Sequence, residues 1–384
     1  LSYFGLVLAV QILGYDPLLK SLIFLSGVTM LFDSTHLLLY GIARSFGDLR
    51  YEAFGMSASQ LITLIIGSIA LYLKWPLITL IAAYTIPSML NCFFIGSVLK
   101  KKYGLKIWPK FHKKTFQHIL AIVAPFALAA IFARFYSYID TLLLEGLMGS
   151  VAVGIYAVAY KITFAFQFLP LALLAGLYPK FSEYFHTNKE KLTEIFEQSI
   201  HYLSLLSFPI ATGIFVLAPA IIHFVFGAEY SGSALPLQLL ILSLIFSFLT
   251  FPIGAALNAC NRQKIQTTII GGVMIVNIAF NLVLIPIFGA VGAALSALIG
   301  NMLLTIIGYF FIPQIFRVRH GVILILLGKI LLASVIMGGA VYFVQQFDQL
   351  VLSVLVGVVV YPSAILFTKA ATISQLKKAF GRVR

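Results

Sequence analysis

The chain has 384 residues, of which 61% are hydrophobic and 10% are charged, with a formal net charge of +14 and a mean hydropathy of +1.04. Soluble globular proteins carry about 25% charged residues, so this composition excludes an ordinary soluble domain. Apolar runs of about 20 residues recur along the whole chain, and each could cross a bilayer as a helix. The runs do not alternate polar and apolar residues as membrane β-barrels do. The composition therefore predicts an all-α integral membrane protein.

The hydropathy pattern predicts twelve membrane spans. Their approximate limits are 1–14, 21–43, 53–73, 76–99, 118–145, 151–178, 200–226, 233–258, 266–288, 289–313, 321–345 and 349–369. The first span is short, and the chain opens with leucine in an apolar run, so we expect a fragment that lacks its N-terminus. A tight turn is expected at Ile287–Gly289, where glycine follows an apolar run.

The basic residues are concentrated in alternate loops. Most of the 26 Lys and Arg residues fall on one side of the predicted membrane, whereas Lys20 and Lys74 fall on the other. By the positive-inside rule the basic side is cytoplasmic, so both ends of this chain are expected in the cytoplasm and the protein in the cell membrane. This distribution accounts for the basic charge without nucleic acid, which is not expected as a partner.

One cytoplasmic segment, 180–199, has alternating charges and apolar residues at helical spacing. It is interpreted either as a short amphipathic helix at the inner membrane surface or as a plain solvated helix, and the sequence leaves both open. No nucleophile–base pair or metal-ligand spacing occurs, and the outer loops are short. An enzyme, a metal site and a cofactor are therefore not expected.

Three charged residues lie within one apolar pair of spans. Arg134 and Asp140 precede the turn at Glu145–Ser150, and Lys161 follows it. A charge at mid-membrane costs about 2.5–3.5 kcal/mol, so each should face a cavity or a partner. One interpretation is an ion pair between Asp140 and Lys161 that joins the two helices. The remaining Arg134 would offer forked hydrogen-bond donors to an anionic group.

Two spans carry polar stripes. The second span has Thr29, Asp33, His36, Tyr40 and Arg44, whose spacing of 4, 3, 4 and 4 places them on one helical face. The sixth span has Tyr156, Tyr160, Thr163 and Gln167. Such stripes either line a cavity or make hydrogen bonds between helices. In the cavity interpretation Asp33 and His36 contribute to ion coupling or ligand contact, and the tyrosines offer ring faces and hydroxyls to a ligand.

An internal repeat appears when the chain is shifted by 214 positions, which brings Asn258 onto Arg44. Spans 53–73 and 76–99 then fall on 267–287 and 290–313. Repeats with an even number of spans keep their orientation and are related by an axis along the membrane normal. We expect a partial N-lobe at 1–99, a six-helix C-lobe at 118–313, two additional helices at 321–369 and a basic cytoplasmic tail at 370–384.

Three stretches resemble a known family. They are FARFYSYIDTLLL, GIYAVAYKITFAFQFLPLALLAGLYPKFSEYF and FPIGAALNACNRQKIQTTIIGGVMIVNIAFNLVLIPIFGAVGAALSALIG. They resemble polysaccharide flippases of the multidrug/oligosaccharidyl-lipid/polysaccharide exporter superfamily, and the resemblance covers most of 20–313. It implies about 14 helices in two lobes around a central cavity, of which this chain lacks the first two.

The resemblance also implies a function. It implies transfer of a polyprenyl-diphosphate-linked glycan between membrane leaflets by alternating access, with membrane lipids and glycan-assembly proteins such as a polymerase as partners. We expect the cavity to contain Arg134, Lys161, Asp140, Asp33, His36, Tyr40, Arg44, Tyr156, Tyr160 and Gln167. Two alternatives stay open: a multidrug or cation antiporter of the same superfamily, which would need an acidic cavity, and a flippase for the peptidoglycan lipid precursor.

Overall fold

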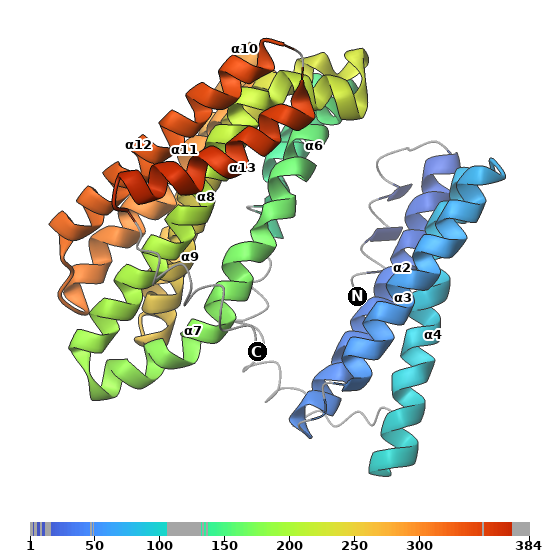
Figure 1. The fold of residues 1–384 in the computed structure, drawn as a ribbon. Helices are drawn as coiled ribbons and strands as arrows, with labels where there is room; N and C mark the ends of the chain where they lie inside the picture. The colour runs from blue at the N-terminus through green and yellow to red at the C-terminus, as the bar shows by residue number, and fades with distance from the viewer. Residues whose placement is uncertain are drawn as a thin grey trace. The chain divides into compact units, whose positions relative to one another are not determined.

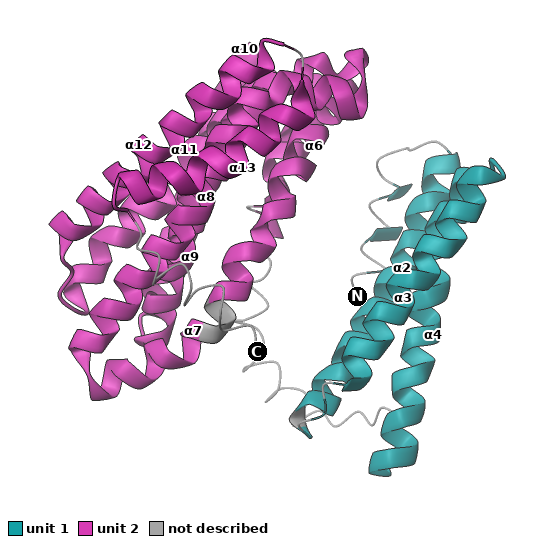
Figure 2. Ribbon diagram, in the orientation of Figure 1, with its two compact units in different colours: residues 1–117 teal, residues 118–384 magenta. Residues whose placement is uncertain are grey.

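Every regular element in the described part of the computed structural model is a helix. The structure describes residues 17–46, 48, 50–105, 132, 134, 135, 137–347 and 349–370, together with residues 3, 6, 7, 10 and 11. Ten helices in this part are long and apolar enough to cross a membrane. The predicted spans 1–14 and 118–145 lie mainly outside the described residues, and the all-α membrane fold is confirmed. The chain divides into unit 1, Leu1–Gln117, and unit 2, His118–Arg384 (Figure 2).

Unit 1 is built on three long helices, α2 (Pro17–Ser45), α3 (Arg50–Tyr72) and α4 (Leu77–Tyr103) (Figure 1). Helix α4 packs along both α2 and α3. The core of unit 1 contains Leu39, Tyr40, Ala43, Ile95 and Leu99. The turn after α2 is tied to the end of α4, because Lys102 Nζ lies 2.6 Å from the Asp48 carboxylate. This hydrogen bond lowers the pKa of Asp48.

Unit 2 contains the remaining described helices. They are α6 (Ser150–Phe164), η1 (Ala165–Gln167), α7 (Phe168–Thr187), α8 (Lys189–Phe226), η2 (Ala228–Ser233), α9 (Ala234–Ala259), α10 (Gln263–Phe288), α11 (Ala290–Phe311), η3 (Ile312–Gln314), α12 (His320–Gln345) and α13 (Leu350–Phe367). Helix α9 is central, since it packs against α6, α7, α8 and α11. Helices α12 and α13 pack on each other and on α8 (Figure 1).

The packing of two helix triplets repeats, as the hydropathy match predicts. Helix α4 packs on α2 and α3, and α11 packs in the same way on α9 and α10. Within each triplet the first two helices have few mutual contacts. The helix ends also agree with the predicted shift, because α2 ends at Ser45 and α9 ends at Ala259. The assignment of these triplets to two lobes stays a prediction.

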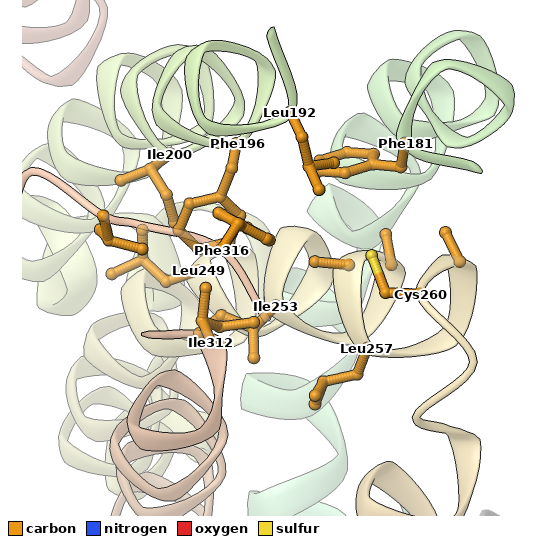
Figure 3. Close-up of a cluster of buried hydrophobic side chains, with 14 of the residues drawn as sticks. Phe181, Leu192, Phe196, Ile200, Leu249, Ile253, Leu257, Cys260, Ile312 and Phe316 are labelled. Carbon is orange, nitrogen blue, oxygen red and sulfur yellow. The ribbon is translucent and has the colours of Figure 1, made fainter. Parts of the chain in front are cut away.

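The segment 180–199 differs from both predicted alternatives. Helix α7 runs on to Thr187, and α8 begins one residue after Asn188, whose side chain accepts hydrogen bonds of 3.0 Å from two backbone nitrogens of the new helix. The apolar face of the first turns of α8 is buried in protein (Figure 3). There the Phe196 ring meets the Phe316 ring edge-on at 5.4 Å. The face is therefore covered by residues distant in the chain and lies neither on lipid nor in solvent.

The predicted tight turn lies between α10 and α11. Helix α10 ends at Phe288, and Gly289 has a φ of +57° that favours glycine. The small residues that follow allow close backbone contact. A Cβ at Gly292 would overlap the Leu284 carbonyl and lie 2.9 Å from the Ile285 nitrogen. The close approach of α10 and α11 at this turn therefore depends on glycine at position 292.

Candidate functional site

A cavity of about 830 Å³ lies within unit 2. It is lined by α6, η1, α7, α9, α10 and α11, together with two residues of the helical segment 137–148. Its polar lining comprises Ser137, Asp140, Tyr156, Tyr160, Thr163, Gln167, Tyr178, Ser243, Ser247, Thr250, Asn258, Gln266, Asn277 and Asn301. Among the residues the structure describes, no Lys or Arg belongs to this lining. The polar groups that face this cavity are thus uncharged apart from one carboxyl group.

The carboxyl group of Asp140 is held by neutral donors. Asp140 is 7% exposed, and Asn281 Nδ2 donates to it at 2.6 Å. The hydroxyl of Tyr156 donates to the other carboxylate oxygen at 3.2 Å. The predicted ion pair with Lys161 is wrong, because Lys161 is exposed and makes no ion pair with any residue of the described ranges. Hydrogen bonds from uncharged groups replace it as the means of stabilising the buried acid.

The predicted stripe of the sixth span does face the cavity. Tyr156, Tyr160 and Gln167 all line it. The rings of Tyr156 and Tyr160 are stacked with centroids 6.1 Å apart and planes inclined by 24°. Phe164 continues the stack at 5.7 Å from Tyr160. At the far end, Gln167 Nε2 donates to the Ser247 hydroxyl at 3.1 Å, which joins η1 to α9.

Sequence reasoning missed a second stripe on α9. Its members, all in the cavity lining, are Ser243, Ser247, Thr250, Gly254 and Asn258. They have the same spacing as the predicted α2 stripe, and the 214-residue shift superposes the two sets position by position. Hydroxyls and a glycine are inconspicuous in an apolar helix, whereas charges are not. The internal repeat was the signal that could have found them.

The α2 stripe is engaged mainly with neighbouring helices of unit 1. Thr29 shares a 2.7 Å hydrogen bond with Thr85 of α4, and Ser88 of α4 donates to Asp33 at 2.6 Å. Tyr40 is fully buried and donates to Asn91 of α4. These contacts support the interpretation of the stripe as interhelical hydrogen bonding.

The remaining members of the stripe differ in how they are held. Arg44 Nε lies 2.8 Å from the Glu52 carboxylate of α3. His36 is 5% exposed, and its Nδ1 lies 3.7 Å from Asp33. The Asp33 side chain is 46% exposed, so it keeps free surface beside this histidine. Substrate contact by any of the five stays a prediction.

Arg134 lies outside the lining of the unit 2 cavity. Its side chain is exposed, and it makes no ion pair with any residue in the described part of the chain. Lys161 likewise lies outside the lining. Their roles toward a substrate stay predictions. A search of the described residues finds no group of three or more His, Cys, Asp or Glu side chains that could hold a metal ion.

A family described as "Polysaccharide biosynthesis protein" matches residues 4–235. The chain is 24% identical over 287 residues to the probable low-salt glycan biosynthesis flippase Agl15 of Haloferax volcanii, covering 71% of this chain and 60% of that protein. It is 30% identical over 185 residues to the probable flippase AglR of the same organism, covering 47% of this chain and 38% of that protein. The chain therefore spans less than two thirds of the length of either relative.

A solved structure shares the fold. The lipid II flippase MurJ in an inward closed conformation aligns with a TM-score of 0.74 and 19% identity, over 91% of this chain and 74% of that chain. At this identity the likeness concerns the fold alone. All three relatives are described as flippases rather than as catalytic enzymes.

Proposed function

The chain belongs to the polysaccharide biosynthesis protein family matched over residues 4–235, and we propose that it transfers a polyprenyl-diphosphate-linked oligosaccharide across the cytoplasmic membrane by alternating access. The substrate is built on the inner face of the membrane and is used on the outer face. Its oily tail can stay in lipid, whereas its polar head needs a hydrated path. A cavity of about 830 Å³ inside a bundle of membrane helices supplies such a space and is the observation that carries the proposal.

Two further features support a carrier of this kind. The triplets α2–α4 and α9–α11 repeat one packing pattern, as expected of transporters built from structural repeats. One relative described as a probable glycan biosynthesis flippase favours a glycan cargo. The orientation with both chain ends in the cytoplasm belongs to the same proposal and rests on the distribution of Lys and Arg.

The cavity chemistry argues against the antiporter alternative. A binding site for cationic drugs needs uncompensated acidic groups. The described lining offers the single carboxyl of Asp140, and that group is 7% exposed and bonded to Asn281 and Tyr156. A neutral polar lining of amides and hydroxyls suits a glycan better.

Deletion of the full-length gene tests the proposal. Spheroplasts are labelled with a tritiated sugar, and the extracted lipid-linked glycan is measured with and without prior digestion by an externally added glycosidase. The proposal expects lipid-linked glycan to accumulate and to resist the external enzyme, and complementation to reverse both effects. Normal external accessibility in the deletion strain would overturn it. Accumulation of the peptidoglycan precursor instead would identify that lipid as the cargo.

A further inference from the structure

We infer that the unit 2 cavity binds the sugar units of the transported lipid and that its diphosphate is bound by residues outside this cavity. The inference rests on the proposed function and divides the substrate head into two parts. A glycan head is neutral, rich in hydroxyls and flat on its ring faces, whereas a diphosphate is a compact anion. Each part needs a different lining.

The lining is unsuited to a diphosphate. Anions in protein sites are matched by Arg, Lys or helix N-termini. The described lining contains no Lys or Arg, and its one carboxyl group, Asp140, offers an anion no positive charge.

Two carboxamides in the lining are available to a ligand. Asn258 lies in the last turn of α9, and Gln266 lies in the first turns of α10. Both side chains are half-buried, and neither makes a side-chain hydrogen bond to any residue in the described ranges. A third carboxamide, Asn301, uses its Nδ2 to donate to the Ala297 carbonyl at 3.0 Å and keeps its oxygen. Each carboxamide offers donors and an acceptor, as a sugar hydroxyl requires.

A glycine makes room for one of these amides. A Cβ at Gly254 of α9 would lie 3.0 Å from Gln266 Nε2, which is tighter than an ordinary contact. With glycine at this position, the Gln266 side chain crosses the face of α9 and stays in the cavity lining. The two helices thus place this amide by close approach rather than by a hydrogen bond.

An aromatic wall completes the lining. Tyr156, Tyr160 and Phe164 follow one another by one turn along α6, and successive ring planes are inclined by only 24° and 19°. All three line the cavity. Flat aromatic faces pack against the C–H faces of sugar rings. Tyr160 and Phe164 carry the accessible part of this wall, because Tyr156 is 1% exposed and donates its hydroxyl to Asp140. A wall of rings together with two amides that make no side-chain hydrogen bond in the described part of the chain is a built site for an uncharged glycan.

Photo-crosslinking with two labels tests the division directly. In the full-length protein, p-benzoylphenylalanine replaces Asn258 in one variant and Ile275 of α10, which is exposed and lies outside the cavity lining, in a control. Cells are labelled with tritiated glucosamine and ³²P-phosphate and irradiated, and the purified protein is treated with mild acid, which cleaves the bond between sugar and diphosphate. The inference expects tritium without ³²P on the position 258 variant and none on the control. Retained ³²P without tritium would overturn it.

Export assays separate this inference from the proposed function. The double variant Asn258→Ala/Gln266→Ala should lower the apparent affinity for lipid-linked glycan about tenfold, which corresponds to about 1.4 kcal/mol. Thr267→Ala, an exposed neighbour outside the cavity lining, should leave it unchanged. Full export by the double variant, in a strain whose gene deletion does trap lipid-linked glycan, would refute the sugar site and leave the flippase proposal intact. A deletion that traps no lipid-linked glycan would instead refute the proposed function.

Discussion

Asn281 donates its side-chain amide to the Asp140 carboxylate at 2.6 Å, and the two residues are 141 positions apart in the chain. The contact joins α10 to the helical segment that precedes α6. Asn281 is fully buried and also contacts Asn277 one turn away at 3.0 Å. The acid therefore depends on a neutral donor that a distant helix supplies.

Changing this donor should destabilise the protein in a graded way. Asn281→Ala removes one hydrogen bond to a charged group and should cost about 1.5–3 kcal/mol of unfolding free energy. Asn281→Asp should cost more, because two carboxylates would then meet in a buried site. Adding Asp140→Asn to that variant restores one acid and one amide and should recover most of the loss. Thermal melting in detergent measures all three, and a double variant no better than Asn281→Asp would contradict the contact.

The same residues show what the sequence could and could not predict. The long apolar helices, the turn at Gly289 and the repeat of helix triplets could be predicted from the pattern of apolar runs and glycine along the chain. The structure contains all three. The partner of Asp140 could not be predicted, because sequence reasoning searched for an opposite charge on the adjacent helix. A buried carboxylate needs donors rather than charges, and asparagines in an apolar helix give a weak signal.

Tyr40 distinguishes a structural stripe from a substrate-binding one. Tyr40→Phe removes the hydroxyl that donates to Asn91 and keeps the ring in the core of unit 1. The loss of one buried hydrogen bond should cost about 1 kcal/mol of stability. Export per folded molecule should be unchanged if the hydroxyl serves only α2–α4 packing. Unchanged melting with lost export would show instead that Tyr40 contacts substrate.

Glu197 and Arg319 should be energetically coupled. The Glu197 side chain is 10% exposed and accepts from Arg319 Nε at 3.0 Å and from the Arg319 backbone nitrogen at 3.1 Å. These two hydrogen bonds hold the start of α12 against α8. A double-mutant cycle with alanine at both positions should give a coupling energy of about 1 kcal/mol, limited by the 59% exposure of the arginine side chain. Additive losses in melting free energy would show that the pair contributes nothing.

Gly292 should tolerate no side chain. Gly292→Ala would press a Cβ into the Leu284 carbonyl across the α10–α11 turn, and overpacking of this kind costs about 1–3 kcal/mol. Gly272→Ala is the matched control, because a Cβ there meets no atom within 4 Å. Alanine at this second position should be neutral or slightly stabilising, since it restricts the unfolded chain. Equal melting temperatures for the two variants would contradict the close approach.

Arg134 is the candidate for the diphosphate that the unit 2 cavity is not suited to bind. It is exposed and makes no ion pair in the described part of the chain, so its charge is uncompensated there. Arg134→Gln removes both the charge and the forked donors and should lower export at least about tenfold, the effect of about 1.4 kcal/mol. Arg134→Lys keeps a point charge, and its export should lie between those of the wild type and Arg134→Gln. Melting should be unchanged in both variants because the side chain is exposed. The exposed Lys74 gives the control, and Lys74→Gln should export normally. Export by Arg134→Gln at the wild-type level, with a normal amount of protein in the membrane, would show that another cation binds the diphosphate.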